Sequence, residues 1–165
     1  MRLPEYDYRT PGAYFLTICT FSRAHLFEDP VLCELVREGW AALPMRFPTI
    51  RLDSFVVMPN HLHGIVWLAL PEHRRHLDSL YSPRLSGIVR VLKSLVAVAY
   101  IRWVAQHDPN RSARVWQRNY YEHVIRDEHE LEQIRHYIRD NPTRWAENRD
   151  NLDLLFKRMR PGEPP

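Results

Sequence analysis

The sequence has few cysteines and no long apolar run, and these absences exclude several classes of protein. Cys19 and Cys33 are the only cysteines in 165 residues and form no CxxC pair, so no disulfide framework is expected. The most apolar stretch, residues 88–104, contains three basic residues and falls short of the roughly 20 apolar residues of a membrane span. Residues 1–6 show no signal-peptide core, and the chain has no internal repeat. We therefore expect one cytoplasmic domain over residues 1–165.

Basic charge is concentrated in one part of the chain. The net charge is only +3, but residues 84–118 hold seven basic residues and a single acidic one, Asp108. The basic residues are Arg84, Arg90, Lys93, Arg102, Arg111, Arg114 and Arg118. Such a segment attracts phosphate backbones whatever their sequence. A solvated helix face with a basic loop explains the same pattern.

Hydrophobic periodicity predicts seven strands and helices in alternating groups. Strands are expected over 13–21, 50–58, 61–68 and within 115–125, and helices over 30–43, 86–106 and 127–140. A polar connector is expected over 71–83, and a flexible tail from about 146. The order β-α-β-β-α-β-α predicts an α+β fold with helices on one face of an antiparallel sheet.

Capping residues and proline predict where the helices begin and end. Asp29 before Pro30 is typical of a helix start, and Asp127 with Glu130 resembles a capping box. Pro142 disfavours helical geometry at the residue before it. The last helix is therefore expected to end near position 140.

A pair of histidines lies at the start of the third predicted strand. In a strand, alternate side chains share a face, so His61 and His63 would project together while Leu62 points into the core. Two adjacent imidazoles can bind a divalent metal, and Gly64 is expected to leave space beside them. On this pattern alone two surface histidines are the simpler explanation, because the chain has nine histidines.

A tyrosine and an asparagine share one face of the last predicted helix. Tyr137 and Asn141 are four residues apart, so their side chains are neighbours. The phenol is a candidate nucleophile, and the amide oxygen a candidate third metal ligand. The same pattern fits a half-buried tyrosine and an asparagine that closes the helix before Pro142.

Residues 115–126 mix aromatic, basic and polar side chains. This composition suits base stacking and phosphate contact. It also suits a sheet edge covered by a helix, so it does not decide between the two. Tyr120 and Tyr121 are the next candidates for a nucleophile if Tyr137 is not one.

Five segments together resemble the HUH single-tyrosine transposases, and within them the REP-associated tyrosine transposases. The segments are GAYFLTICTFSR, FVVMPNHLHGIV, SGIVRVLKSLV, WQRNYYEHVIRD and YIRDNPTRW. Each is modest alone, but they occur in the order and spacing of that family and cover roughly residues 6–145. The resemblance favours the functional interpretation of both candidate sites.

The resemblance implies a ferredoxin-like (RRM-like) fold with the catalytic tyrosine on a C-terminal helix. It implies Tyr137 as the nucleophile and His61, His63 and Asn141 as ligands of Mg²⁺ or Mn²⁺. The substrate would be single-stranded or hairpin DNA from repeated extragenic palindromes, cut through a 5′-phosphotyrosine intermediate and rejoined by a monomer or a homodimer. The residues then expected to bind DNA are Arg84, Arg90, Lys93, Arg111, Arg114 and Arg118.

Two other functions remain open at this point. In a nucleic-acid-binding module, His61, His63, His123 and His136 would form a closed zinc site, although the spacing matches no known zinc motif. A domesticated relative would bind DNA hairpins but seldom cut them. The exposure of the site separates these functions, since a catalytic metal must share an open groove with Tyr137.

Overall fold

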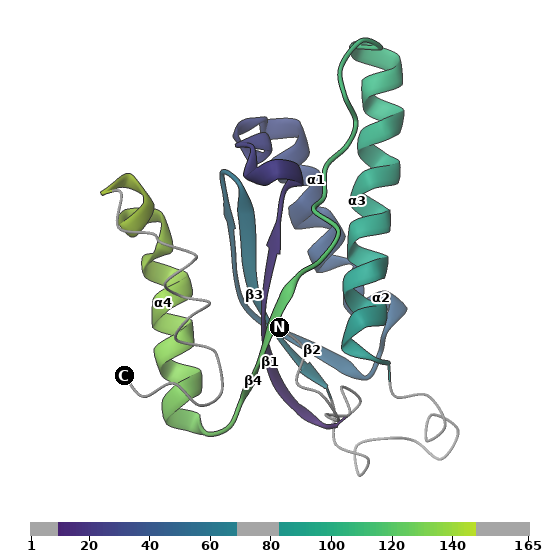
Figure 1. Cartoon of the computed structure of the whole chain (residues 1–165). Helices are drawn as coiled ribbons and strands as arrows, with labels where there is room; N and C mark the ends of the chain where they lie inside the picture. Colours follow the sequence, from purple (N-terminus) through teal and green to yellow (C-terminus); the bar gives the residue numbers. More distant parts are fainter. Residues whose placement is uncertain (1–9, 69–82, 148–165) are drawn as a thin grey trace.

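The computed structural model describes residues 10–68 and 83–147, and the predicted order of strands and long helices is confirmed (Figure 1). The strands are β1 (Gly12–Cys19), β2 (Ile50–Met58), β3 (His61–Leu68) and β4 (Tyr121–Ile125). The α-helices are α1 (Pro30–Ala41), α2 (Leu43–Arg46), α3 (Leu85–His107) and α4 (Glu128–Ala146). Two short 3₁₀ helices, η1 (Phe21–Arg23) and η2 (Leu26–Glu28), follow β1. The predicted connector over 71–83 and the tail after 146 lie almost wholly outside the described residues.

The four strands form one antiparallel sheet in the order β2-β3-β1-β4. The histidine strand β3 is therefore central, between β1 and β2. Its register on β1 pairs His61 with Cys19 and His63 with Thr17. The sheet is that of the expected ferredoxin-like α+β class.

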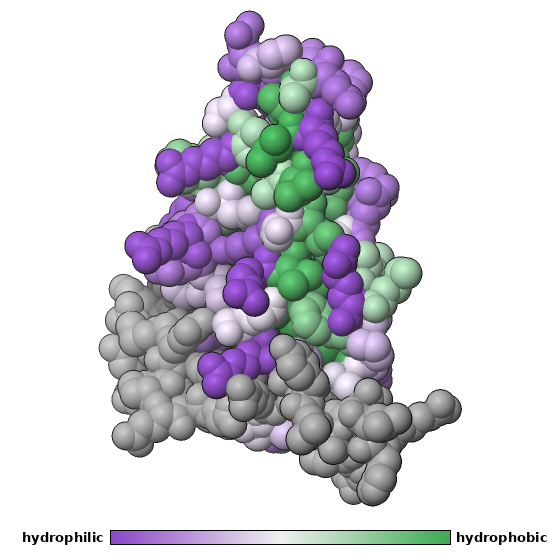
Figure 2. All heavy atoms as spheres, turned by 90° about the vertical axis from the view of Figure 1, so that its right-hand side faces the viewer, coloured by the Kyte–Doolittle hydropathy of each residue, from purple (hydrophilic) through white to green (hydrophobic). Residues whose placement is uncertain are grey.

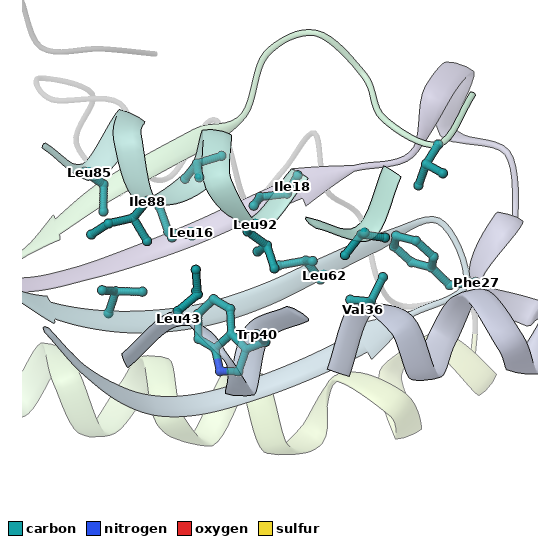
Figure 3. Close-up of a cluster of buried hydrophobic side chains, with 14 of the residues drawn as sticks. Leu16, Ile18, Phe27, Val36, Trp40, Leu43, Leu62, Leu85, Ile88 and Leu92 are labelled. Carbon is teal, nitrogen blue, oxygen red and sulfur yellow. The ribbon is translucent and has the colours of Figure 1, made fainter. Parts of the chain in front are cut away.

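One face of the sheet packs against α1 and α3. Leu16, Ile18 and Leu62 point to this side and meet the apolar faces of both helices (Figure 3). Gly64 also faces this side, where a Cβ atom would collide with the ring of Trp40. The expectation that this glycine leaves space beside the histidines was wrong, because the position two residues from Leu62 points away from them.

The opposite face of the sheet is covered by α4. Its apolar stripe packs on side chains of β1, β3 and β4, in a cluster formed by Ala13, Phe15, Ile65, Ile125, Leu131, Ile134 and Ile138. The sequence predicted helices on one face of the sheet. This is correct for α1 and α3, but α4 lies alone on the opposite face (Figure 1). Both faces of the central strands are buried, because each has a covering layer.

The last helix continues beyond the position where it was expected to end. Asp127 caps its start by accepting a hydrogen bond from the Glu130 backbone N–H, as predicted. The helix then passes through Pro142 and ends at Ala146, so the predicted end near 140 was wrong. Contacts of the Trp145 ring with the rings of His25 and His61 hold this last turn against the sheet end. The stabilisation from these tertiary contacts thus outweighs the loss of the one backbone hydrogen bond that an interior proline removes.

The outer side of α3 carries an exposed apolar strip between hydrophilic side chains (Figure 2). Val98 and Ile101 are 44% and 52% exposed there. No helix within residues 10–68 and 83–147 is long and apolar enough to cross a membrane.

Candidate active site

His61 and His63 lie side by side on the α4 face of the sheet. Both are fully buried, and their Nε2 atoms are 3.0 Å apart. Leu62 between them points to the opposite core, as the strand alternation predicted. Two nitrogens that each lie about 2.1 Å from one ion, at right angles, are about 3.0 Å apart. The spacing therefore fits two adjacent ligands of a single metal ion.

The outer nitrogen of each imidazole has a polar partner. His61 Nδ1 lies 2.7 Å from Asn60 Oδ1, and His63 Nδ1 lies 2.9 Å from Thr17 Oγ1. An amide oxygen can only accept, so His61 Nδ1 carries the hydrogen and Nε2 keeps its lone pair. Partners of this kind orient metal-binding histidines and raise their basicity.

Both imidazoles are neutral at physiological pH. Burial and, to a smaller extent, the positive charge of Arg23 lower the pKa of His61 to about 3. Burial also holds the pKa of His63 well below its usual value, with the neighbouring His61 adding to the effect. Neutral imidazole is the form that binds a metal, so no proton has to be displaced first.

Tyr137 on α4 reaches the same histidines from the covering layer. Its Oη lies 3.3 Å from His63 Nε2, and the two rings meet at a tilt with centroids 5.2 Å apart. The tyrosine ring also packs edge-on against Phe15, and the guanidinium of Arg144 lies 5.4 Å from its centre. Tyr137 thus shares a site with the histidine pair within one chain, although both imidazoles are buried where an open groove was expected.

Asn141 lies between two residues that contact the histidine pair. It is one helical turn after Tyr137 and one turn before Trp145, and the Trp145 ring lies 6.1 Å from the His61 ring. Asn141 is completely buried, and neither its Oδ1 nor its Nδ2 has a hydrogen-bond partner among the described residues. A buried amide without a partner is costly and requires an explanation. A metal ion held by His61, His63 and Asn141 Oδ1 would supply one.

The closed zinc site of four histidines is not formed. His123 Nε2 lies 2.6 Å from Glu130 Oε1, and the exposed His136 pairs with Asp140 at 2.9 Å. Within the described part of the chain, no group of three or more His, Cys, Asp or Glu side chains could hold a metal ion. A third protein ligand beside the histidine pair would have to be of another type, such as an amide.

The basic residues predicted to bind DNA divide into two groups. Five are exposed: Arg84, Arg90, Arg111, Arg114 and Arg118. Of these, Arg111 forms an ion pair with Asp29 at 2.8 Å. The ammonium of Lys93 donates hydrogen bonds to the carbonyl oxygens of Gln117 and Asn119 at 2.8 and 3.1 Å. Lys93 therefore orders a loop.

Sequence reasoning missed several residues of the site. Thr17 contacts His63 only through the β1–β3 register, and Arg23 acts on His61 from a turn after β1. Asn60 could have been found from the sequence, because it directly precedes the histidine pair. Tyr121, an alternative nucleophile, pairs with Thr17 on the far side of β1 from the histidines. Two strand spacings, roughly 10 Å, separate it from β3.

Comparisons with known proteins find both sequence relatives and solved structures of similar fold. An uncharacterized protein of Haemophilus influenzae is 37% identical over 172 residues, covering 93% of this chain and 92% of the relative. A second protein of that organism, named “Putative REP-associated tyrosine transposase”, is 24% identical over 84% of this chain and 74% of its own length. A solved REP-associated tyrosine transposase bound to a REP hairpin has the same fold, with a TM-score of 0.61, 21% identity, and coverage of 87% of this chain and 74% of that one. The chain matches no family model.

Proposed function

We propose that the chain is a REP-associated tyrosine transposase, and that it cuts and rejoins single-stranded DNA with Tyr137 as the nucleophile. One observation carries the proposal. A phenol oxygen lies 3.3 Å from one of two buried imidazole nitrogens that are themselves 3.0 Å apart. A tyrosine with only a structural role would not require two neutral imidazoles next to its hydroxyl, each held by a polar partner at its Nδ1 atom.

We propose that the Nε2 atoms of His61 and His63 and the Oδ1 atom of Asn141 hold Mg²⁺ or Mn²⁺. When bound, the ion would neutralise charge on the scissile phosphate and orient it. The donor set is neutral and supplies three ligands, which leaves positions for water and phosphate oxygens. All three donors and Tyr137 come from one chain, so the site requires no second copy.

The covalent step needs no external energy source. Tyr137 Oη forms a bond to phosphorus as the bond between phosphorus and the 3′ oxygen breaks. The phenol proton leaves to solvent, and the departing oxygen takes up a proton to become a 3′-hydroxyl. A free tyrosine has a pKa of about 10, so the phosphate must be held in line with the phenol before the proton is lost. Attack by a 3′-hydroxyl on the phosphotyrosine reverses the step and rejoins the strand.

We propose a DNA hairpin with a single-stranded flank as the substrate. The solved relative is bound to a REP hairpin. In this chain the exposed residues Arg84, Arg90, Arg114 and Arg118 supply the positive charge that a phosphate backbone requires. Activity should therefore be assayed on DNA hairpins whose single-stranded flanks differ in sequence.

Incubation with such hairpins and Mn²⁺ tests the proposal. The wild-type protein should form a covalent protein–DNA adduct that survives denaturing electrophoresis. Tyr137→Phe should form none, while its folding and its hairpin affinity stay within about twofold of wild type, because the ring packing remains. A structural tyrosine would lose at most about 1 kcal/mol on this change and cutting would continue.

The His61→Ala variant separates the metal from the nucleophile. It keeps Tyr137 but loses one ligand, so cutting should be slow and partly restored at high Mn²⁺. An adduct formed by the Tyr137→Phe protein would move the nucleophile elsewhere, with Tyr120 and Tyr121 tested next. Tight hairpin binding without any adduct from the wild type would favour a binding role.

A further inference from the structure

An arginine lies over the ring of the candidate nucleophile. The guanidinium carbon of Arg144 is 5.4 Å from the centre of the Tyr137 ring, within the range of a cation–π contact. Arg144 is exposed, whereas the tyrosine is half-buried, with its hydroxyl 3.3 Å from His63 Nε2. An exposed positive charge is therefore held beside the ring whose hydroxyl faces the histidine pair.

The side chain of Arg144 extends back along α4. Seven residues separate it from Tyr137, which is about 10 Å along the helix axis, so its guanidinium must reach towards the start of the helix to lie over that ring. An arginine in the last turn of a helix can instead bind the carbonyl groups at the C-terminal end. A guanidinium over a residue two turns earlier is directed away from that end, so helix capping does not explain its position.

The ion pair that the sequence offers Arg144 is also not formed. Asp140 lies one turn before it, in the order of acidic and then basic residue that favours such pairs. The carboxylate instead pairs with the exposed His136 at 2.9 Å. Within residues 10–68 and 83–147, no carboxylate forms an ion pair with Arg144. The charge of this arginine is therefore available to an anionic ligand.

Trp145 fixes the part of the backbone that carries this arginine. Its ring contacts the rings of His61 and His25 at 6.1 and 5.4 Å, at the end of the sheet where the histidine pair lies. Consecutive residues of a helix point about 100° apart, so a fixed Trp145 also fixes the direction in which the residue before it leaves the helix. The last turn of α4 is thus held in a rotation that places Arg144 beside Tyr137.

We propose that Arg144 binds the non-bridging oxygens of the scissile phosphate when Tyr137 attacks it. The inference rests on the proposed strand-cleavage function. The two imidazoles and the Asn141 amide bring no charge of their own, whereas the phosphate is anionic. A guanidinium can donate hydrogen bonds to two phosphate oxygens at once. An exposed cation–π contact is weaker than such hydrogen bonds, so it keeps the side chain at the site and still releases it to a bound strand.

Removing the charge from either of two arginines on α4 tests this role. Arg144→Gln should slow adduct formation under single-turnover conditions by about 10- to 100-fold, the scale of one hydrogen bond to a charged group. Arg144→Lys should recover part of the rate. Arg139→Gln is the matched control, because Arg139 is exposed on another side of the same helix, with Nη2 3.5 Å from His136 Nδ1. This control should cut at the wild-type rate, and neither glutamine should change the melting temperature much, since both side chains are exposed.

Binding to a neutral phosphate analogue gives a second readout. The adduct formed by the wild type identifies the scissile position, where a methylphosphonate then replaces the phosphate. The titrations use a Tyr137→Phe background and a chelator, so that no metal ion favours the charged form. The analogue should then bind about 10-fold more weakly than normal DNA, and adding Arg144→Gln should reduce this difference to about twofold or less. An arginine with only a structural role would weaken the binding of both DNAs equally.

The outcomes separate this inference from the proposed function. Cutting by Arg144→Gln at the wild-type rate would overturn the inference, and so would equal slowing by Arg139→Gln, which would show a general effect of charge on α4. A methylphosphonate penalty that is absent, or that Arg144→Gln leaves unchanged, would also overturn it. Each of these results leaves strand cleavage by Tyr137 intact as long as the wild type forms its adduct. Absence of an adduct from the wild type would overturn both.

Discussion

At the level of single residues, Asn141 is buried without any hydrogen-bond partner for its amide among the described residues. The cost of such a group is about 1–3 kcal/mol. The surrounding helix face places it between Tyr137 and Trp145, over the histidine pair. We therefore expect the buried amide to lower the stability of the metal-free protein. Only a bound ion would offset this cost.

Replacing Asn141 with leucine should therefore change stability in opposite directions with and without metal. Leucine has a similar size and no polar atoms, so the metal-free protein should gain about 1–2 kcal/mol in free energy of unfolding. The stabilisation that Mn²⁺ gives the wild type should largely disappear in the variant. Denaturant unfolding in a chelator and in Mn²⁺ measures both effects. A metal-free variant less stable than wild type would show that the amide has a structural role instead.

At the level of elements, one ion pair fastens α4 to the far edge of the sheet. Asp53 on β2 accepts hydrogen bonds from Arg135 Nε at 3.0 Å and Nη2 at 2.6 Å, and from the Trp67 ring N–H at 3.0 Å. These bonds, with Arg135 the largest cause, hold the pKa of the Asp53 carboxyl far below its usual range. The pair sets the rotation of α4 and with it the position of Tyr137.

Asp53→Asn should destabilise the protein and slow cutting together. The side chains of Asp53 and Arg135 are 11% and 27% exposed, so screening reduces the loss to about 1–2 kcal/mol at pH 7. Because the folded-state pKa is depressed, the carboxylate stabilises the fold above its unfolded pKa of about 3.9. That contribution is lost as the pH falls below this value. Urea unfolding of both proteins should show a difference that is constant above about pH 5 and shrinks below pH 4. A difference as large at pH 3 as at pH 7 would contradict the ionic explanation.

At the level of the whole molecule, basic residues that look alike in sequence have different surroundings. The guanidinium of Arg114 is exposed and lies 3.7 Å from the centre of the Phe21 ring. Arg111, three residues earlier, is paired with Asp29, so its charge is already partly balanced. Only an uncompensated cation releases a full counterion equivalent from DNA when it binds.

Alanine at these two positions should affect hairpin binding differently. Arg114→Ala should weaken affinity and flatten the slope of log K against log salt by roughly 0.7–0.9, the value for one phosphate contact. Arg111→Ala should change the slope less and lower the melting temperature instead, since Asp29 loses its partner. Titrations of DNA at several salt concentrations measure these slopes. In the same assay the wild type should bind hairpins more tightly than a blunt duplex of the same sequence. Equal slope changes for the two variants would show that the ion pair opens on binding.

Short-range patterns in the sequence were enough to predict the elements and the chemical groups. The two-residue period of a β-strand placed His61 and His63 on one face. The helical period placed Tyr137 and Asn141 on one side of the last helix. Asp29 indicated a helix start because its side chain can cap the first turn. Each depends on residues no more than about four apart, so neighbours in sequence decide it.

Only the tertiary structure decided how these groups meet. The hydrogen bond of Thr17 with His63 joins residues 46 apart, and the contact of Tyr137 with His63 joins residues 74 apart. Sheet register, the face that α4 covers and its passage through Pro142 all follow from packing between distant segments, which no local period encodes. The same long-range packing engages Lys93 with a loop and pairs Arg111 with Asp29, and the charge pattern of the sequence alone does not show which cations are paired in this way.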